Sequence, residues 1–265
     1  MAISPVERQN LLADLSSVAI RDLVELWRRA TVADVDFAQF LIDAYPEIAV
    51  SYAEVAADLA ADWYEQSAPD LPYQAVTAGP PPVDVLQKST QWALGADGDK
   101  ALSRLSGTLQ RSVFDGARRT TLVNVEREGS KWVRYASANA CAFCALLATR
   151  SAVYTSKQSA TRVVGQGKDI STNFDASGKR KSGGQARGIK TRGSRKIGEK
   201  YHDHCHCVAV EVRPGRRYTP PPHVQEFKRA YKDAFDAVPD GMAYDSNNSV
   251  LKAVLSNMRS DLGSH

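Results

Sequence analysis

The sequence predicts a mainly α-helical protein that also carries a small α+β module. Apolar residues recur at spacings of three and four up to about residue 128, which predicts an N-terminal helical bundle. Short alternating segments then surround a Cys/His cluster, and helical spacing returns in a C-terminal tail. All four cysteines fall in two short clusters, Cys141 to Cys144 and Cys205 to Cys207. Soft ligands grouped in this way indicate that zinc staples the module.

A capping signal predicts the first helix. Ser4 can accept a hydrogen bond from the amide of Glu7, the Glu7 side chain can reach back, and Pro5 needs no donor at the first helical position. The helix is expected to run to about Arg29. Its apolar side chains share one face because they lie mostly three or four residues apart: Leu11, Leu12, Leu15, Val18, Ala19, Leu23, Leu26 and Trp27.

The capping pattern repeats at Thr31 to Asp34, which predicts the start of a second helix reaching about Gln66. Pro46 either kinks this helix or starts a new one. Residues 68–82 are rich in proline and interrupt the helical pattern, so they form a connector. A short helix is expected at residues 83–94.

A long helix, capped by Asp99, completes the predicted bundle. Its buried stripe consists of Leu102, Leu105, Leu109, Val113, Ala117, Thr120 and Val123. Its arginines are expected to lie mostly elsewhere around the circumference: Arg104, Arg111, Arg118 and Arg119. Packing into a bundle buries the apolar sides of several such helices in one core.

The pattern changes after Gly129, where short segments with strand-like alternation appear. Strands are predicted at residues 131–135, 151–156 and 207–213. Residues 164–200 contain glycine, serine and basic residues but almost no large apolar side chain, so they cannot offset their ordering entropy and form a loop.

Three segments therefore organise the chain. Residues 1–128 form the helical N-terminal region, and residues 129–213 form the Cys/His module with the basic loop at 164–200. Residues 214–265 form a linker and C-terminal helices, of which the first is expected at 223–238.

Charge is distributed unevenly along the chain. Residues 1–100 carry 6 Lys/Arg against 16 Asp/Glu, whereas residues 162–200 carry 11 against 3. The two regions are therefore expected to meet different partners, the basic one a polyanion. No run approaches the ~20 apolar residues of a membrane-spanning helix, and Met1 to Asn10 lacks the features of a signal peptide. We expect no membrane partner and synthesis in a cytoplasm, where cysteines stay reduced.

The cysteine spacing predicts a zinc site. Two residues between Cys141 and Cys144 let both sulfur atoms turn to one side of a tight turn. Alternation along an extended chain places Cys205 and Cys207 on one face, and directs the nearby histidines the other way unless the chain turns just before Cys205. We expect these four cysteines to bind Zn²⁺, with His202 as the strongest substitute for one of the late cysteines.

A closed set of four ligands has no position for a substrate water, which favours a structural zinc and a protein that is not an enzyme. Two disulfides or unligated core thiols are the structural alternatives. If water replaced one ligand, His202, His204 or His206 could activate it. The protein would then be a zinc-dependent nuclease. A cytoplasmic zinc-bearing DNA-binding protein is a further alternative.

The basic loop is the candidate nucleic-acid contact. Its cations could neutralise phosphates without reading sequence, because Phe174 is the one aromatic residue there that could stack on a base. The alternative is a solvated loop that maintains solubility. The candidate contacts are Lys179, Arg180, Lys181, Arg187, Lys190, Arg192, Arg195 and Lys196.

The order of four motifs resembles the Mu F-like minor head proteins of tailed bacteriophages, especially the type found in phages of actinobacteria. These motifs are Trp132-Val-Arg, Cys141-Ala-Phe-Cys-Ala, Ser151-Ala-Val-Tyr and Tyr201-His-Asp-His-Cys-His-Cys-Val-Ala-Val. The resemblance covers residues 131–212, apart from the basic insert. The family pattern Cys-x-x-Cys followed by His-x-x-Cys-x-Cys corresponds here to Cys141, Cys144, His202, Cys205 and Cys207.

This resemblance implies a low-copy minor capsid protein of the virion, located inside the capsid near the portal and active in head morphogenesis. Its partners would be the portal or the major capsid protein, with packaged DNA as a nonspecific contact through the basic loop. The resemblance implies no catalytic activity. Some members of such families leave the capsid with the DNA, so roles in packaging or ejection are also implied.

Overall fold

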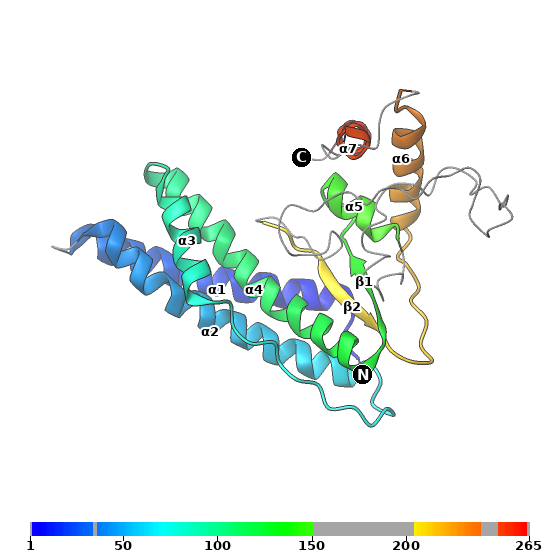
Figure 1. The fold of residues 1–265 in the computed structure, drawn as a ribbon, viewed down its shortest axis with the longest axis horizontal. Coiled ribbons are helices and arrows are strands. Elements are labelled where there is room, and N and C mark those ends of the chain that lie inside the picture. Colours follow the sequence, from blue (N-terminus) through cyan, green and yellow to red (C-terminus); the bar gives the residue numbers. More distant parts are fainter. Residues whose placement is uncertain (1, 34–35, 151–203, 240–248, 264–265) are drawn as a thin grey trace, which may run out of the picture. The chain divides into compact units, whose positions relative to one another are not determined.

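The computed structural model describes residues 2–33, 36–150, 204–239 and 249–263 (Figure 1). These residues contain seven helices and a two-stranded sheet, which confirms the predicted fold class. The chain forms two compact units. The first comprises the described parts of Met1–Tyr135 and Tyr201–Arg216, and the second those of Ala136–Lys200 and Arg217–His265.

Helix α1 (Pro5–Val32) starts as the sequence predicts. The Ser4 amide donates to Glu7 Oε2 at 2.8 Å, and the Glu7 amide donates to Ser4 Oγ at 3.3 Å, which completes the capping box. The helix ends three residues later than expected. Thr31 remains inside it, with its hydroxyl donating to the Trp27 carbonyl oxygen.

Helix α2 (Phe37–Gln66) begins after Asp36, whose carboxylate accepts from the Gln39 amide at 3.0 Å. The prediction of a start at Thr31 to Asp34 was therefore wrong, because the first helix has already taken up Thr31. Pro46 lies inside a continuous α2. The helix tolerates the missing hydrogen bond because its buried small residues pack along α4.

Helix α3 (Val83–Leu94) and helix α4 (Gly98–Glu128) complete the bundle. Asp97, rather than Asp99, is the N-cap of α4, so Asp99 lies in the first turn, where its charge favours the helix dipole. Gly129 closes the helix with a left-handed φ of 71°, which glycine adopts without strain. The core of the first unit lies between these helices, with side chains such as Leu23, Tyr45 and Leu109 fully buried.

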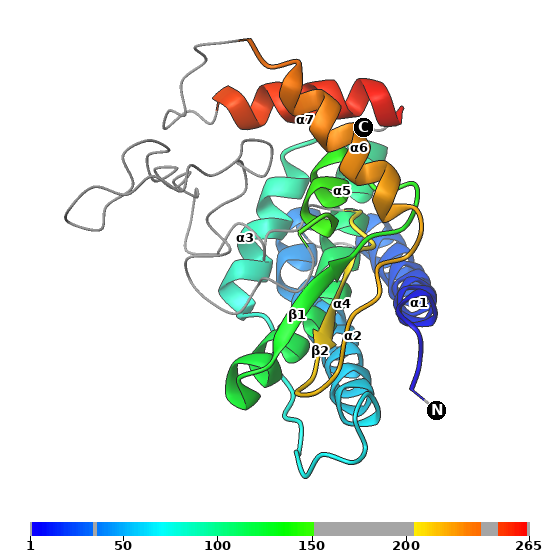
Figure 2. The same ribbon diagram turned by 90° about the vertical axis from the view of Figure 1, so that its right-hand side faces the viewer.

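Strands β1 (Lys131–Tyr135) and β2 (Val208–Val212) pair antiparallel, with Val133 opposite Val210. Figure 2 shows the two strands side by side. Two of the three predicted strands are thus confirmed, and the third, at residues 151–156, lies outside the described residues. Strand β2 also contacts α4 and α1.

Two buried ion pairs attach β2 to the helices. Arg8 of α1 donates to both carboxylate oxygens of Glu211 at 2.8 Å, and both side chains are almost fully buried. Arg213, just after β2, donates to both carboxylate oxygens of Glu128 at 2.6 and 2.7 Å. The Glu128 carboxylate also accepts from the Tyr64 hydroxyl at 2.8 Å. Such bidentate pairs fix the orientation as well as the position of the strand.

The second unit contains three helices, α5 (Ala142–Ala148), α6 (Val224–Asp236) and α7 (Ser249–Leu262). All three contact one another. The C-terminal helix expected at 223–238 is confirmed as α6, and its predicted apolar positions are buried: Val224, Phe227, Tyr231 and Phe235. Within the described ranges, no helix has the continuous apolar length that crossing a bilayer requires.

Candidate metal centre

The late cysteines, Cys205 and Cys207, lie in the extended residues that lead into β2, and both are buried. His204 directly precedes them with a φ of 60°, a left-handed conformation that is uncommon for residues other than glycine. The chain therefore turns immediately before Cys205. The sequence alone did not decide whether the chain turns at this point. Because it does, His204 does not belong to the extended segment in which Cys205 and Cys207 alternate with His206.

Arg118 of α4 holds the main chain of both late cysteines. Its Nε donates to the Cys207 carbonyl oxygen at 2.8 Å, and its Nη2 lies 2.6 Å from the carbonyl oxygens of Cys205 and Cys207. Its Nη1 donates to Asp115 Oδ1 at 3.1 Å. The side chain is 1% exposed, so the expectation for Arg118 was wrong: it lies in the interior, where it satisfies carbonyl groups that water cannot reach.

The residue between the late cysteines is held from two other helices. The Gln9 side-chain amide of α1 donates to the His206 carbonyl oxygen at 2.7 Å. The His206 ring stacks on Phe114 of α4, with centroids 5.4 Å apart and planes 21° from parallel. Burial lowers the pKa of His206, an effect that the neighbouring Cys205 opposes and that Arg118 and His204 reinforce.

The early cysteines lie at the start of α5. Cys141 is the N-cap residue, and its carbonyl oxygen accepts from the Ala145 amide at 2.9 Å. Cys144 lies within the first turn of the helix. Cys144 is buried and Cys141 half-buried. The Cys-x-x-Cys spacing thus forms a helical turn rather than an isolated loop.

The two late cysteines form a pair with metal-site geometry. Their sulfur atoms lie within 4.8 Å of each other, and both residues are buried. A Zn–S bond of about 2.3 Å places the sulfur atoms of a tetrahedral site about 3.8 Å apart, so this pair could supply two ligands of such a site after small adjustments. All four cysteines of the chain are thiols rather than disulfides in the structure.

The other predicted site residues have different outcomes. Cys141 and Cys144, three residues apart at the start of α5, belong to the second unit, and the late cysteines belong to the first. His202 lies outside the described residues, as do all the candidate nucleic-acid contacts: Lys179, Arg180, Lys181, Arg187, Lys190, Arg192, Arg195 and Lys196. Arg118 and Gln9 were not recognised from the sequence, because nothing local relates them to cysteines far along the chain.

Comparison with known proteins places the chain in one family. No curated protein and no solved structure matches it significantly. Residues 5–234 match the family described as VG15 protein, a family of viral and phage gene products. Because this match covers well over half of the sequence, the chain belongs to the VG15 protein family.

Proposed function

We propose that this chain is a structural minor capsid protein of a tailed phage, of the Mu F-like type, which acts in head assembly from a position inside the capsid near the portal. Membership of a phage family supports the phage setting. The finer role depends mainly on one observation: two cysteines of the Mu F-like motif, Cys205 and Cys207, are buried with their sulfur atoms within 4.8 Å of each other.

The chemistry of this group favours zinc in a structural role. Thiolate ligands suit Zn²⁺, and a site closed by four protein ligands leaves no place for a reacting water. Cys141 and Cys144 are the proposed other two ligands, with His202 as the substitute for one of the late cysteines. The metal would contribute to stability by linking residues that are distant in sequence, and the protein would not be an enzyme.

Helix α2 is the proposed docking surface for the portal or the major capsid protein. It carries six acidic residues and no Lys or Arg. All six are exposed: Asp43, Glu47, Glu54, Asp58, Asp62 and Glu65. At about 3.6 residues per turn they lie within an arc of about 100° over a length of about 33 Å. This acidic stripe would complement a basic surface on the partner.

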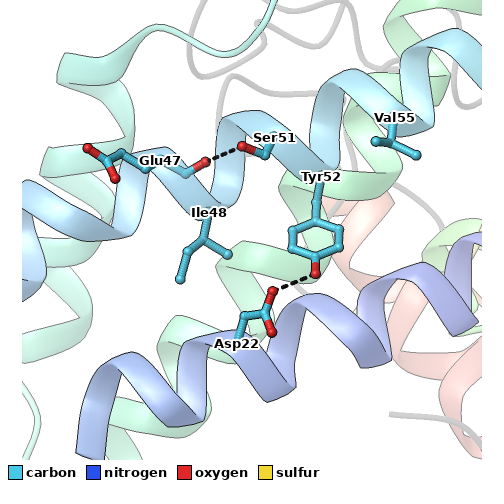
Figure 3. A pocket seen from close by; sticks show the side chains of 6 residues that line it. All are labelled: Asp22, Glu47, Ile48, Ser51, Tyr52 and Val55. Atoms are coloured by element: carbon cyan, nitrogen blue, oxygen red, sulfur yellow. Dashed lines mark hydrogen bonds between the residues drawn. The ribbon is translucent and has the colours of Figure 1, made fainter. Parts of the chain in front are cut away.

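A shallow hollow borders the acidic stripe (Figure 3). Its volume is about 420 Å³, and Ile48, Tyr52 and Val55 of α2 contribute to its lining. The Tyr52 hydroxyl donates to Asp22 Oδ2 of α1 at 2.6 Å, and this hydrogen bond raises the pKa of Tyr52 to about 12. Val55 is 46% exposed. The surface therefore offers an apolar contact beside the charges, which a purely solvated helix would not need.

The basic residues between 162 and 200 are the proposed contact with packaged DNA. Eleven Lys/Arg against three acids in this stretch would neutralise phosphates without reading sequence. Deletion of residues 164–200 should weaken duplex binding in a mobility-shift assay, most clearly at low salt. Unchanged binding would remove DNA contact from the proposal while leaving the assembly role untouched.

Purified phage particles provide the main test. The protein should copurify with them, and elemental analysis of the isolated chain should find one zinc per molecule. Incubation with plasmid DNA and Zn²⁺ should produce no cleavage. Absence from particles would overturn the capsid role, and metal-dependent cleavage would favour the alternative of a zinc-dependent nuclease.

The docking surface can be tested separately by charge reversal. The double variant E54K/D58K should weaken binding to portal or capsid protein by about tenfold or more, because its two new lysines would face the basic surface of the partner. The matched control, E226K/D233K, makes the same charge change on the exposed face of α6. Equal binding by both double variants and the unmodified protein would contradict docking through α2.

A further inference from the structure

The Arg118 side chain forms hydrogen bonds to the main chain of both late cysteines. Its guanidinium donates to the carbonyl oxygens of Cys205 and Cys207 at 2.6 to 2.8 Å. The carbonyl group of the residue between them, His206, points to Gln9 instead. The two cysteine carbonyls thus face one way and the His206 carbonyl another, which is the alternation of an extended chain.

This arrangement restricts the two cysteines more than an ordinary strand would. Charged donors form the stronger hydrogen bonds, and a guanidinium presents its donors in a rigid plane. Two peptide groups bound to one such plane have fixed orientations, and a Cα–Cβ bond direction follows from the orientation of the adjoining peptides. The side chains of Cys205 and Cys207 are therefore set on a common side by a group that is not itself a ligand.

Charge also connects Arg118 to a thiolate site. A guanidinium whose side chain is 1% exposed is stabilised by nearby negative charge, such as that of Asp115 at 3.1 Å. Zinc with four thiolates has a net charge of −2, and zinc with three thiolates and a neutral imidazole has −1. The buried guanidinium of Arg118, which contacts the main chain of Cys205 and Cys207, partly offsets the net negative charge of either site.

We propose that Arg118 is the positioning residue of the metal site: it orients Cys205 and Cys207 before metal binds and compensates the charge of their thiolates afterwards. This inference rests on the proposed zinc site. It adds that one half of the site is preorganised by the helical bundle, so that zinc meets two ligands already in place. Outer-shell partners of this kind typically change metal affinity by about 10- to 100-fold.

The test compares three variants of the full-length chain. R118K keeps the charge but loses the planar fork, and R118Q loses both the charge and most of the hydrogen bonds. R213K is the matched control, because Arg213 belongs to the same unit, is also 1% exposed and forms a bidentate ion pair, but with Glu128 rather than with the main chain of the cysteines. Zinc affinity is measured by competition with a chromogenic chelator, and the Co²⁺-substituted protein reports thiolate–metal charge transfer by absorption.

We expect R118Q to bind zinc about 10- to 100-fold more weakly than the unmodified protein. Its Co²⁺ charge-transfer band should shift, because removal of a positive charge changes the thiolate energies, whereas R118K should retain more of the original band. R213K should lower thermal stability without altering zinc affinity or the band. A purely structural role for Arg118 would affect R118K and R213K alike.

Equal zinc affinity of R118K, R118Q and R213K would overturn the positioning role while leaving the zinc site intact. Failure of the unmodified protein to hold zinc would overturn the proposed site itself, and the positioning role with it. If R118Q does not fold, the zinc affinities of R118K and R213K are compared instead, because both variants retain a buried cation. A lower affinity of R118K alone supports the positioning role, and equal affinities overturn it.

Discussion

Replacement of Gly116 by alanine should destabilise the protein, although the same change usually stabilises a helix. Gly116 lies in the middle of α4, where α4 crosses α2. A Cβ atom added there would lie 2.2 Å from the Ala53 carbonyl oxygen and 3.0 and 3.1 Å from the Ala53 carbonyl carbon and Cα. These are main-chain atoms, so no side-chain rotation can relieve the overlap.

The size of the effect follows from this geometry. An ordinary contact begins at 3.4 Å, so α2 and α4 must separate by about 1.2 Å at this point, the difference between 3.4 and 2.2 Å. Alanine favours the helix over glycine by about 1 kcal/mol, whereas overpacking of a tight interface typically costs about 1–3 kcal/mol and more when backbone must move. We expect G116A to lower the free energy of unfolding by about 2 kcal/mol.

Urea denaturation followed by circular dichroism measures this change, with zinc held constant in all samples. The control is S103A, at an exposed position of the same helix, which should alter the free energy of unfolding by no more than about 0.5 kcal/mol. If G116A proves as stable as the unmodified protein, or more stable, the close approach of α2 and α4 is refuted.

Two further predictions concern the ion pairs that attach β2. E211Q should destabilise the protein by about 3–5 kcal/mol in the same denaturation assay, because it leaves the guanidinium of Arg8 buried without its counter-charge; a change below 1 kcal/mol would contradict the pair. Burial acts to raise the pKa of Glu128, but hydrogen bonds from Arg213 and Tyr64 outweigh it and leave the pKa below its ordinary value. This stabilisation is present above the unfolded pKa of the carboxyl and is lost as the pH falls through the lowered folded value, so the unmodified protein should lose stability on acidification more steeply than E128Q. Parallel acid profiles for the two proteins would count against the linkage.

The features that local sequence predicted are those whose physics is local. The Ser4–Glu7 capping box, the glycine that ends α4 and the apolar face of α6 each depend on residues within a few positions of one another. Where local signals competed, prediction failed: Thr31 and Asp99 are acceptable caps by composition, but the N-cap residues of α2 and α4 are Asp36 and Asp97. Packing of the flanking helices, which composition does not contain, selects between such neighbouring caps.

The sequence by itself determined the helical bundle, the positions of the two strands and the grouping of the cysteines into two clusters, because periodicity and spacing report directly on backbone geometry. Only the tertiary structure decided that β1 pairs with β2, that Glu211 and Arg213 meet carboxylate or guanidinium partners on the helices, and that Arg118 lies buried behind the late cysteines. The reason is physical: such contacts join residues separated by roughly 70 to 200 positions, and their partners are selected by packing that no local pattern encodes.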